Sequence, residues 1–141
     1  MLKRALLSGL AILIAWMVLD LLWHRYVLAP LYAVNATRWR PFDQMNVALI
    51  YLVTFALIAI FVATYQRLVR PKSLGAGVTF GAFIGLALGI SAGFGTYIHM
   101  PIPLTLAWGW FRGGWLKGVA AGAIVGRLIT DSHGHKQHES P

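Results

Sequence analysis

The sequence predicts an all-α, polytopic membrane protein with four transmembrane helices, in which the glycine-rich third and fourth helices pack together. Three observations predict this class. The chain is 58% hydrophobic and only 11% charged, whereas an average soluble domain is about 25% charged. Its 141 residues contain four long apolar runs, each close to the roughly 20 residues that a helix needs to cross a bilayer. Glycine recurs every four residues in the last two runs.

The glycines of these two runs form stripes. At about 100° per residue, a four-residue step keeps each set on one slowly drifting helix face. In a bilayer, missing side chains let two helix backbones approach closely and pack. We therefore expect contact between the two stripes, which consist of Gly77, Gly81, Gly85, Gly89 and Gly93, and of Gly114, Gly118, Gly122 and Gly126. Gly109 and Gly113 precede the second stripe, and we expect them to remain available to a partner protein.

Taken in order, the apolar runs predict spans at 5–22, 46–65, 74–98 and 104–129. A basic start followed by an apolar run also describes a secretory signal peptide, but Pro30 makes a poor cleavage context, so we expect an uncleaved first helix. The connection 23–45 is rich in Trp and Tyr, which settle at the membrane–water boundary, and a short interfacial helix is expected to begin at Pro30. The chain divides into a transmembrane domain, 1–129, with this aromatic outer loop, and a flexible cytoplasmic tail, 130–141.

The formal net charge of +8 is explained by topology. Basic residues gather at the N-terminus, in the connection 66–73 and after the last run, and fewer lie in the other connections. The positive-inside rule then places both termini in the cytoplasm. Because no basic surface domain is left for nucleic acid, the expected partners are membrane lipids and either further copies of the chain or other membrane subunits. The absence of cysteine excludes disulfides and thiolate metal sites.

Polar side chains from three predicted helices fall at similar depth toward the outer leaflet. Asp20 and His24 are four residues apart and share one helix face. Because a charge inside a bilayer is costly and finds a partner, Arg112 is expected to pair with Asp20. Tyr97 and His99 end the third run at the same depth. The cluster is either a structural ion pair or a proton or ion relay in which Asp20 and His24 titrate. A fixed arginine partner favours the structural pair, because it would hold Asp20 ionised.

Lys117 lies deeper in the fourth run, near the glycine stripe. We expect it to reach a water pocket or a backbone carbonyl, with a contact to an anion or substrate as the alternative. No cofactor is expected. His24 and His99 leave open a b-type haem between facing helices, and Met100 beside His99 leaves open a copper(I) site. A weak metal site in the tail is a further alternative to a solvated extension; its candidate ligands are His133, His135 and His138, with Asp131 and Glu139.

Several stretches resemble a family of small four-helix bacterial inner-membrane proteins of uncharacterised function. They are LDLLWH (19–24), the residues 28–32, WRP (39–41), the stretch 97–103 and the glycine-rich last helix. The resemblance covers most of the chain. It implies the topology, a location in the inner (plasma) membrane of a bacterium, and the cluster of Asp20 and His24. Lys117 and the His-containing tail depart from the pattern. The family has no assigned activity to carry over.

The sequence contains no hydrolase serine motif, phosphate loop or HExxH zinc helix, and it has four acidic residues in total. We therefore expect no enzyme. Two functions of different classes remain. The first is a non-catalytic helix bundle that forms an oligomer or serves as an accessory subunit of a larger membrane complex, as the surplus of close-packing glycine indicates. The second is a small proton- or ion-coupled transporter that uses Asp20 and His24.

Overall fold

The computed structural model describes residues 2–34 and 39–131, and every regular element within these ranges is helical. The first and third long helices each continue through a π-helical turn into a short helix. The bounds are Leu2–Leu22 for α1, Trp23–Val27 for the first π turn, Ala29–Ala33 for α2, Phe42–Gln44 for a 3-10 turn, Val47–Leu68 for α3, Leu74–Ile90 for α4, Ser91–Gly95 for the second π turn, Thr96–His99 for α5 and Leu104–Leu128 for α6.

Three helical segments are long and apolar enough to cross a membrane, namely Leu2–Val27, Val47–Leu68 and Leu74–His99. By helix length and hydropathy the chain is thus a small multi-pass membrane protein. α6 has 25 residues but is not among these segments; it is more polar, since it carries Arg112, Lys117 and Arg127. Where the sequence predicted four spans, three of the described helices qualify by length and composition.

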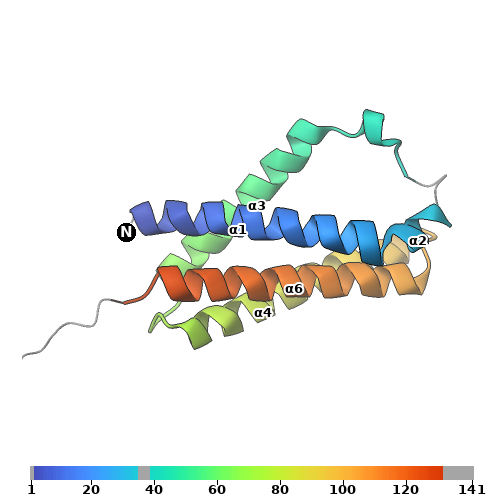
Figure 1. The fold of residues 1–141 in the computed structure, drawn as a ribbon. Coiled ribbons are helices and arrows are strands. Elements are labelled where there is room, and N and C mark those ends of the chain that lie inside the picture. The colour runs from blue at the N-terminus through green and yellow to red at the C-terminus, as the bar shows by residue number, and fades with distance from the viewer. Residues whose placement is uncertain (1, 35–38, 132–141) are drawn as a thin grey trace, which may run out of the picture.

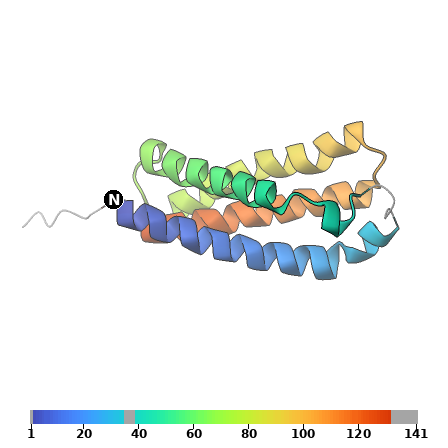
Figure 2. The same ribbon diagram turned by 90° about the horizontal axis from the view of Figure 1, so that it is seen from above.

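α1, α4 and α6 lie alongside one another, with α6 running opposite to the other two (Figures 1 and 2). We call the end that holds Leu2 and Leu128 the terminal end. The opposite end, where α1 passes into α2 and α5 is followed by α6, is the loop end. Leu2 and Leu128 lie at the same end because α6 runs back along α1 (Figure 1).

α4 and α6 make the most extensive interface between the described helices, and glycine faces glycine along it. A methyl group added at Gly81 would lie 2.7 Å from Gly122 Cα, and one added at Gly85 would lie 2.9 Å from Gly118 Cα. Carbon atoms normally touch at about 3.5–4.0 Å, so a residue with a Cβ would push the two backbones apart. The two stripes therefore meet, and backbone atoms also crowd the remaining members, Gly77, Gly89, Gly93, Gly114 and Gly126.

A second glycine stripe on α6 faces the end of α1 and its extension. A methyl group at Gly113 would lie 2.8 Å from Trp23 Nε1, and one at Gly109 would meet the side chain of Leu28. Trp23 Nε1 also donates a hydrogen bond of 2.9 Å to the carbonyl oxygen of Gly109. The expectation that Gly109 and Gly113 stay available to a partner protein is wrong, because the first π turn and the residue after it pack onto them.

α3 diverges from the other long helices toward the loop end (Figure 1). Asn46 caps its first turn by accepting a hydrogen bond of 3.0 Å from the backbone nitrogen of Leu49. No residue from 47 to 57 is buried, and Ile58 is the first residue of α3 that is. Phe61 and Tyr65 then enter the main apolar core with α1 and α6 residues. Only the terminal half of α3 belongs to the bundle.

Polar contacts join the helices at the terminal end. Asp131, just after α6, accepts hydrogen bonds from the backbone nitrogen of Lys72 at 2.7 Å and from Arg70 Nη1 at 3.2 Å. The Lys72 side chain is buried and its Nζ lies 3.5 Å from the same carboxylate. Arg4 Nη1 donates to the carbonyl oxygen of Thr130 at 3.3 Å. These contacts tie the end of α6 to α1 and to the connection between α3 and α4.

Candidate functional site

The polar centre of the bundle is an ion pair between α1 and α6. Lys117 Nζ lies 2.7 Å from Asp20 Oδ2. Arg112 is exposed instead, and its guanidinium carbon lies 5.8 Å from the centre of the Trp108 ring. The predicted Asp20–Arg112 pair is therefore wrong: the acid has a cationic partner on α6, but that partner is Lys117.

The phase of α6 explains this choice. Lys117 follows Gly113 by four residues, so it leaves α6 on nearly the same side, and Gly113 packs against Trp23. Arg112 precedes Gly113 by one residue and therefore leaves the helix about 100° away. One turn further toward the terminal end, Lys117 comes level with Asp20 on the antiparallel α1.

Trp16 on α1 also contacts Lys117. Its Nε1 donates a hydrogen bond of 3.0 Å to the backbone carbonyl oxygen of Lys117, and Lys117 Nζ lies 4.9 Å from the centre of the Trp16 ring. An ammonium at this distance is attracted by the negative face of an indole. The cation is thus placed between a carboxylate and a buried aromatic ring, one turn apart on α1.

A row of polar side chains continues from Asp20 toward α2, and hydrogen bonds join its last three members, His24, Tyr32 and Trp110. Trp110 Nε1 donates to the Tyr32 hydroxyl oxygen at 2.7 Å, which leaves the hydroxyl hydrogen to donate to His24 Nδ1, also 2.7 Å away. The rings of His24 and Tyr32 are stacked, with centroids 5.7 Å apart. A neutral imidazole that accepts at Nδ1 carries its proton on Nε2. That Nε2 faces Asp20 Oδ1 at 4.0 Å.

Tyr32 lies beyond the segment Leu2–Val27 that can cross a membrane. Burial raises the pKa of the Tyr32 phenol, while the hydrogen bond from Trp110 acts in the opposite direction. The phenol therefore stays protonated at neutral pH and keeps its hydrogen for His24.

Asp20, His24 and Lys117 line a cavity of ≈ 380 Å³ at the loop end. Asp20 and His24 are half-exposed, with 44% and 48% of their side chains accessible, and Lys117 is 26% exposed. The wall is completed by Trp23, Ala92, Thr96, Trp110, Gly113 and Gly114. Both π turns contribute to it, and single π-helical turns inside α-helices are frequent at functional sites. The arrangement can present a carboxylate, an ammonium and an imidazole N–H to one small ligand.

Two members of the predicted cluster lie elsewhere. Tyr97 and His99 are exposed on α5, and neither lines the cavity that contains Asp20 and His24. Of the five residues predicted to form one polar cluster, Asp20 and His24 line this cavity, whereas Tyr97, His99 and Arg112 do not. Both residues belong to the short α5, Thr96–His99.

His24 and His99, the two histidines considered as haem ligands, do not line the same cavity. Within residues 2–34 and 39–131, no group of three or more His, Asp or Glu side chains could hold a metal ion. His24 Nδ1 is already hydrogen-bonded to Tyr32. Asp131, considered with the tail histidines, instead contacts Arg70 and Lys72. His133, His135, His138 and Glu139 lie outside the described residues.

Comparison with protein-family models, with curated proteins and with solved structures gives no match.

Sequence reasoning missed Trp16, Tyr32 and Trp110 as members of the site. All three were visible as aromatic residues with a polar atom, which usually finds a hydrogen-bond partner when the ring is buried. The step of four residues from Gly113 to Lys117 was also visible. It could have placed Lys117 on the side of α6 that carries Gly113.

Proposed function

We propose that α6 is a fourth span and that the chain crosses a bacterial inner membrane with both termini in the cytoplasm. The 25 residues of α6 extend about 37 Å at roughly 1.5 Å per residue, which exceeds a hydrocarbon core of about 30 Å. Its central cation, Lys117, is neutralised by Asp20. The terminal end collects Lys3, Arg4, Arg67, Arg70, Lys72 and Arg127, as the positive-inside rule requires of a cytoplasmic face.

Single cysteines test this topology cleanly, because the chain has no cysteine of its own. We expect a membrane-impermeant maleimide to label Arg40→Cys in intact spheroplasts and Lys3→Cys only after lysis. Labelling of Lys3→Cys in intact cells would contradict the orientation.

Within this topology we infer that the chain is a non-catalytic helix bundle that assembles with further membrane helices. The observation that carries this inference is the divergence of α3, whose residues 47–57 are not buried by any described part of the chain. Residues 47–53 at its start are all exposed, so over about 10 Å, at roughly 1.5 Å per residue, this helix presents every face to its surroundings. Such a helix is suited to contact a neighbouring protein in the membrane.

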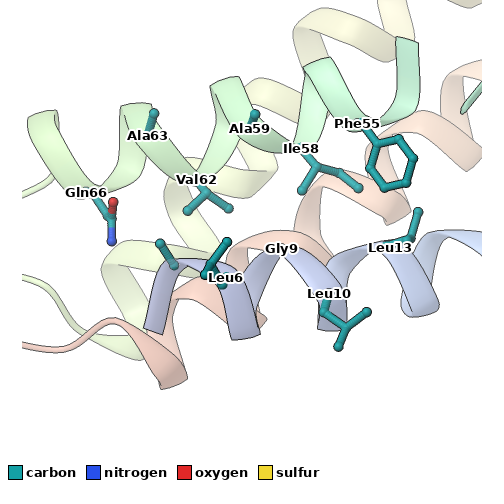
Figure 3. Close-up of a pocket in the computed structure, with 11 residues that line it drawn as sticks. Leu6, Gly9, Leu10, Leu13, Phe55, Ile58, Ala59, Val62, Ala63 and Gln66 are labelled. Atoms are coloured by element: carbon teal, nitrogen blue, oxygen red, sulfur yellow. The ribbon is translucent and has the colours of Figure 1, made fainter. Parts of the chain in front are cut away.

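A groove beside α3 supports the same function. It has a volume of ≈ 520 Å³ and lies between α1 and the terminal half of α3. Figure 3 shows its lining, which is apolar apart from Gln66 and includes Gly9, Ala59 and Ala63. Small residues at a membrane-facing surface let another helix approach closely. We propose that a helix of a second copy occupies the groove; a different membrane subunit is the alternative.

Oxidative crosslinking in native membranes tests this assembly. Leu52→Cys on α3 should give a disulfide-linked dimer, whereas Phe83→Cys on α4 should not, although both side chains are strongly exposed, at 65% and 69%. A photo-crosslinker attached at Leu52→Cys would join the chain to a protein of different mass if the partner is another subunit. A chain that remains monomeric in both assays, and in native mass spectrometry from mild detergent, would refute the proposal.

The row of polar side chains that starts at Asp20 favours a second candidate, a small proton- or ion-coupled transporter. Asp20, His24 and Tyr32 follow one another from the ion pair toward α2, and such chains of acid and histidine carry protons in membrane pumps. The close Lys117 partner argues for a structural role of Asp20. Proteoliposomes with an enclosed pH dye test the transporter. If the chain is a transporter, wild-type vesicles show a proton or solute flux that Asp20→Asn and His24→Gln reduce. Wild-type vesicles without flux would exclude transport.

A further inference from the structure

Two further pockets adjoin the cavity at the loop end. A second pocket of ≈ 330 Å³ shares Ala92, Gly114 and Lys117 with it. A third, of ≈ 230 Å³, shares Trp16, Leu57, Phe61, Ile84 and Leu88 with the second. Pockets that share these lining residues adjoin one another, and we call the three together the trough; its walls come from α1, α3, α4 and α6.

The trough changes character along its length. Its loop end contains Asp20, His24 and Thr96. Beyond Lys117 the lining is apolar except for Ser91 and Thr64. From Leu57 to Thr64 on α3, and from Leu88 to Phe80 on α4, the pocket walls run toward the terminal end. A polar end near the loops and an apolar end toward the bilayer centre match the way in which an outer-leaflet lipid lies.

The charges at the polar end of the trough indicate which lipid head group could bind there. Asp20 Oδ2 accepts from Lys117 at 2.7 Å, but Oδ1 is 4.0 Å from His24 Nε2, which is beyond hydrogen-bond distance. Oδ1 can therefore accept from the N–H of a ligand ammonium. Lys117 has three N–H donors, so it can donate to a ligand phosphate while it keeps Asp20. A zwitterion adds no net charge to this pair, and its two charges can lie antiparallel to it.

We propose that the trough binds a phospholipid whose zwitterionic head carries a primary amine, with the head against Asp20 and Lys117 and one acyl chain in the apolar pockets. Phosphatidylethanolamine has this chemistry. Phosphatidylcholine lacks an ammonium N–H for Asp20 Oδ1, and phosphatidylglycerol brings a net negative charge to the carboxylate. The site binds lipid whether or not the chain assembles through α3.

Native mass spectrometry of the full chain tests the proposal with phosphatidylethanolamine, phosphatidylcholine and phosphatidylglycerol of identical acyl chains. We expect wild type to retain phosphatidylethanolamine about tenfold better than the other two, the ratio expected for one charge-assisted hydrogen bond. The double variant Asp20→Leu/Lys117→Met removes both charges together and should lose this preference. Arg112→Gln is the matched control, because it removes an α6 cation that does not line the trough; it should keep the preference.

Leu88→Trp provides an independent test that leaves the charges intact. Leu88 lines both apolar pockets, so the larger side chain should block the acyl chain and weaken retention of all three lipids, with circular dichroism confirming the helical fold. Equal retention of the three lipids by wild type, or the same preference in the double variant, would overturn the proposal. Unchanged retention by a folded Leu88→Trp would overturn the placement of the acyl chain.

Discussion

Replacing Gly81 by alanine tests the contact between α4 and α6. The added methyl group would lie 2.7 Å from Gly122 Cα, 2.8 Å from Gly122 N and against the carbonyl oxygen of Gly118. These are backbone atoms, so no side-chain rotation can relieve the overlap. To restore carbon contacts of about 3.5 Å, the two helices must separate locally by roughly 1 Å.

The expected cost follows from two opposing effects. Overpacking a close interface typically costs about 1–3 kcal/mol. Alanine has a higher helix propensity than glycine, by up to about 1 kcal/mol, and this gain offsets part of the cost. We therefore expect Gly81→Ala to lower the free energy of unfolding by about 1–2 kcal/mol, which is roughly a 5- to 30-fold change in the unfolding constant.

Unfolding by dodecyl sulfate in mixed micelles, followed by far-UV circular dichroism, measures this change. Gly75→Ala on the same helix is the control, because the nearest atom to its methyl group would be Ser73 Oγ at 4.0 Å. Gly114→Ala, with its methyl group 3.1 Å from Gly89 Cα, should fall between the two. If Gly81→Ala unfolds at the same detergent fraction as Gly75→Ala, the glycine contact is refuted.

Three further predictions concern the polar contacts. Asp20→Asn and Lys117→Met each leave a charge without its partner, and each should lower the free energy of unfolding by about 1 kcal/mol. The double variant should lose less than the sum of the two, because the half-exposed pair is removed as a unit. Strict additivity in the detergent assay would show that the pair contributes nothing. Trp23→Phe removes the hydrogen bond to Gly109 and should cost about 1 kcal/mol, so an unchanged unfolding midpoint would contradict that bond. Because burial raises the pKa of Tyr32 above its ordinary value of 10.0, the stability that this phenol contributes is present below pH 10.0 and is lost as pH rises through the folded-state pKa. The stability difference between wild type and Tyr32→Phe, measured from about pH 8 to pH 11, should therefore shrink toward alkaline pH, and a constant difference would refute it.

Much of the fold was predictable because its signals are local. Long apolar runs predicted the helices, and Leu2–Val27, Val47–Leu68 and Leu74–His99 are long and apolar enough to cross a membrane. The step of four residues in the glycine ladders predicted their meeting, since spacing along one helix determines which residues share a face. The presence of a cation for Asp20 was likewise predictable, because a charge in an apolar segment requires a partner.

What the tertiary structure alone decided is how the helices are rotated and shifted against one another. Lys117 and not Arg112 meets Asp20 because the Gly113 side of α6 faces α1. Trp23 and Leu28 fill the space beside Gly113 and Gly109. Spacing within one helix carries no information about the neighbour's rotation or axial position, which depend on packing along the whole interface. For the same reason the chain's composition could predict α3 as a helix, but not its departure from the bundle.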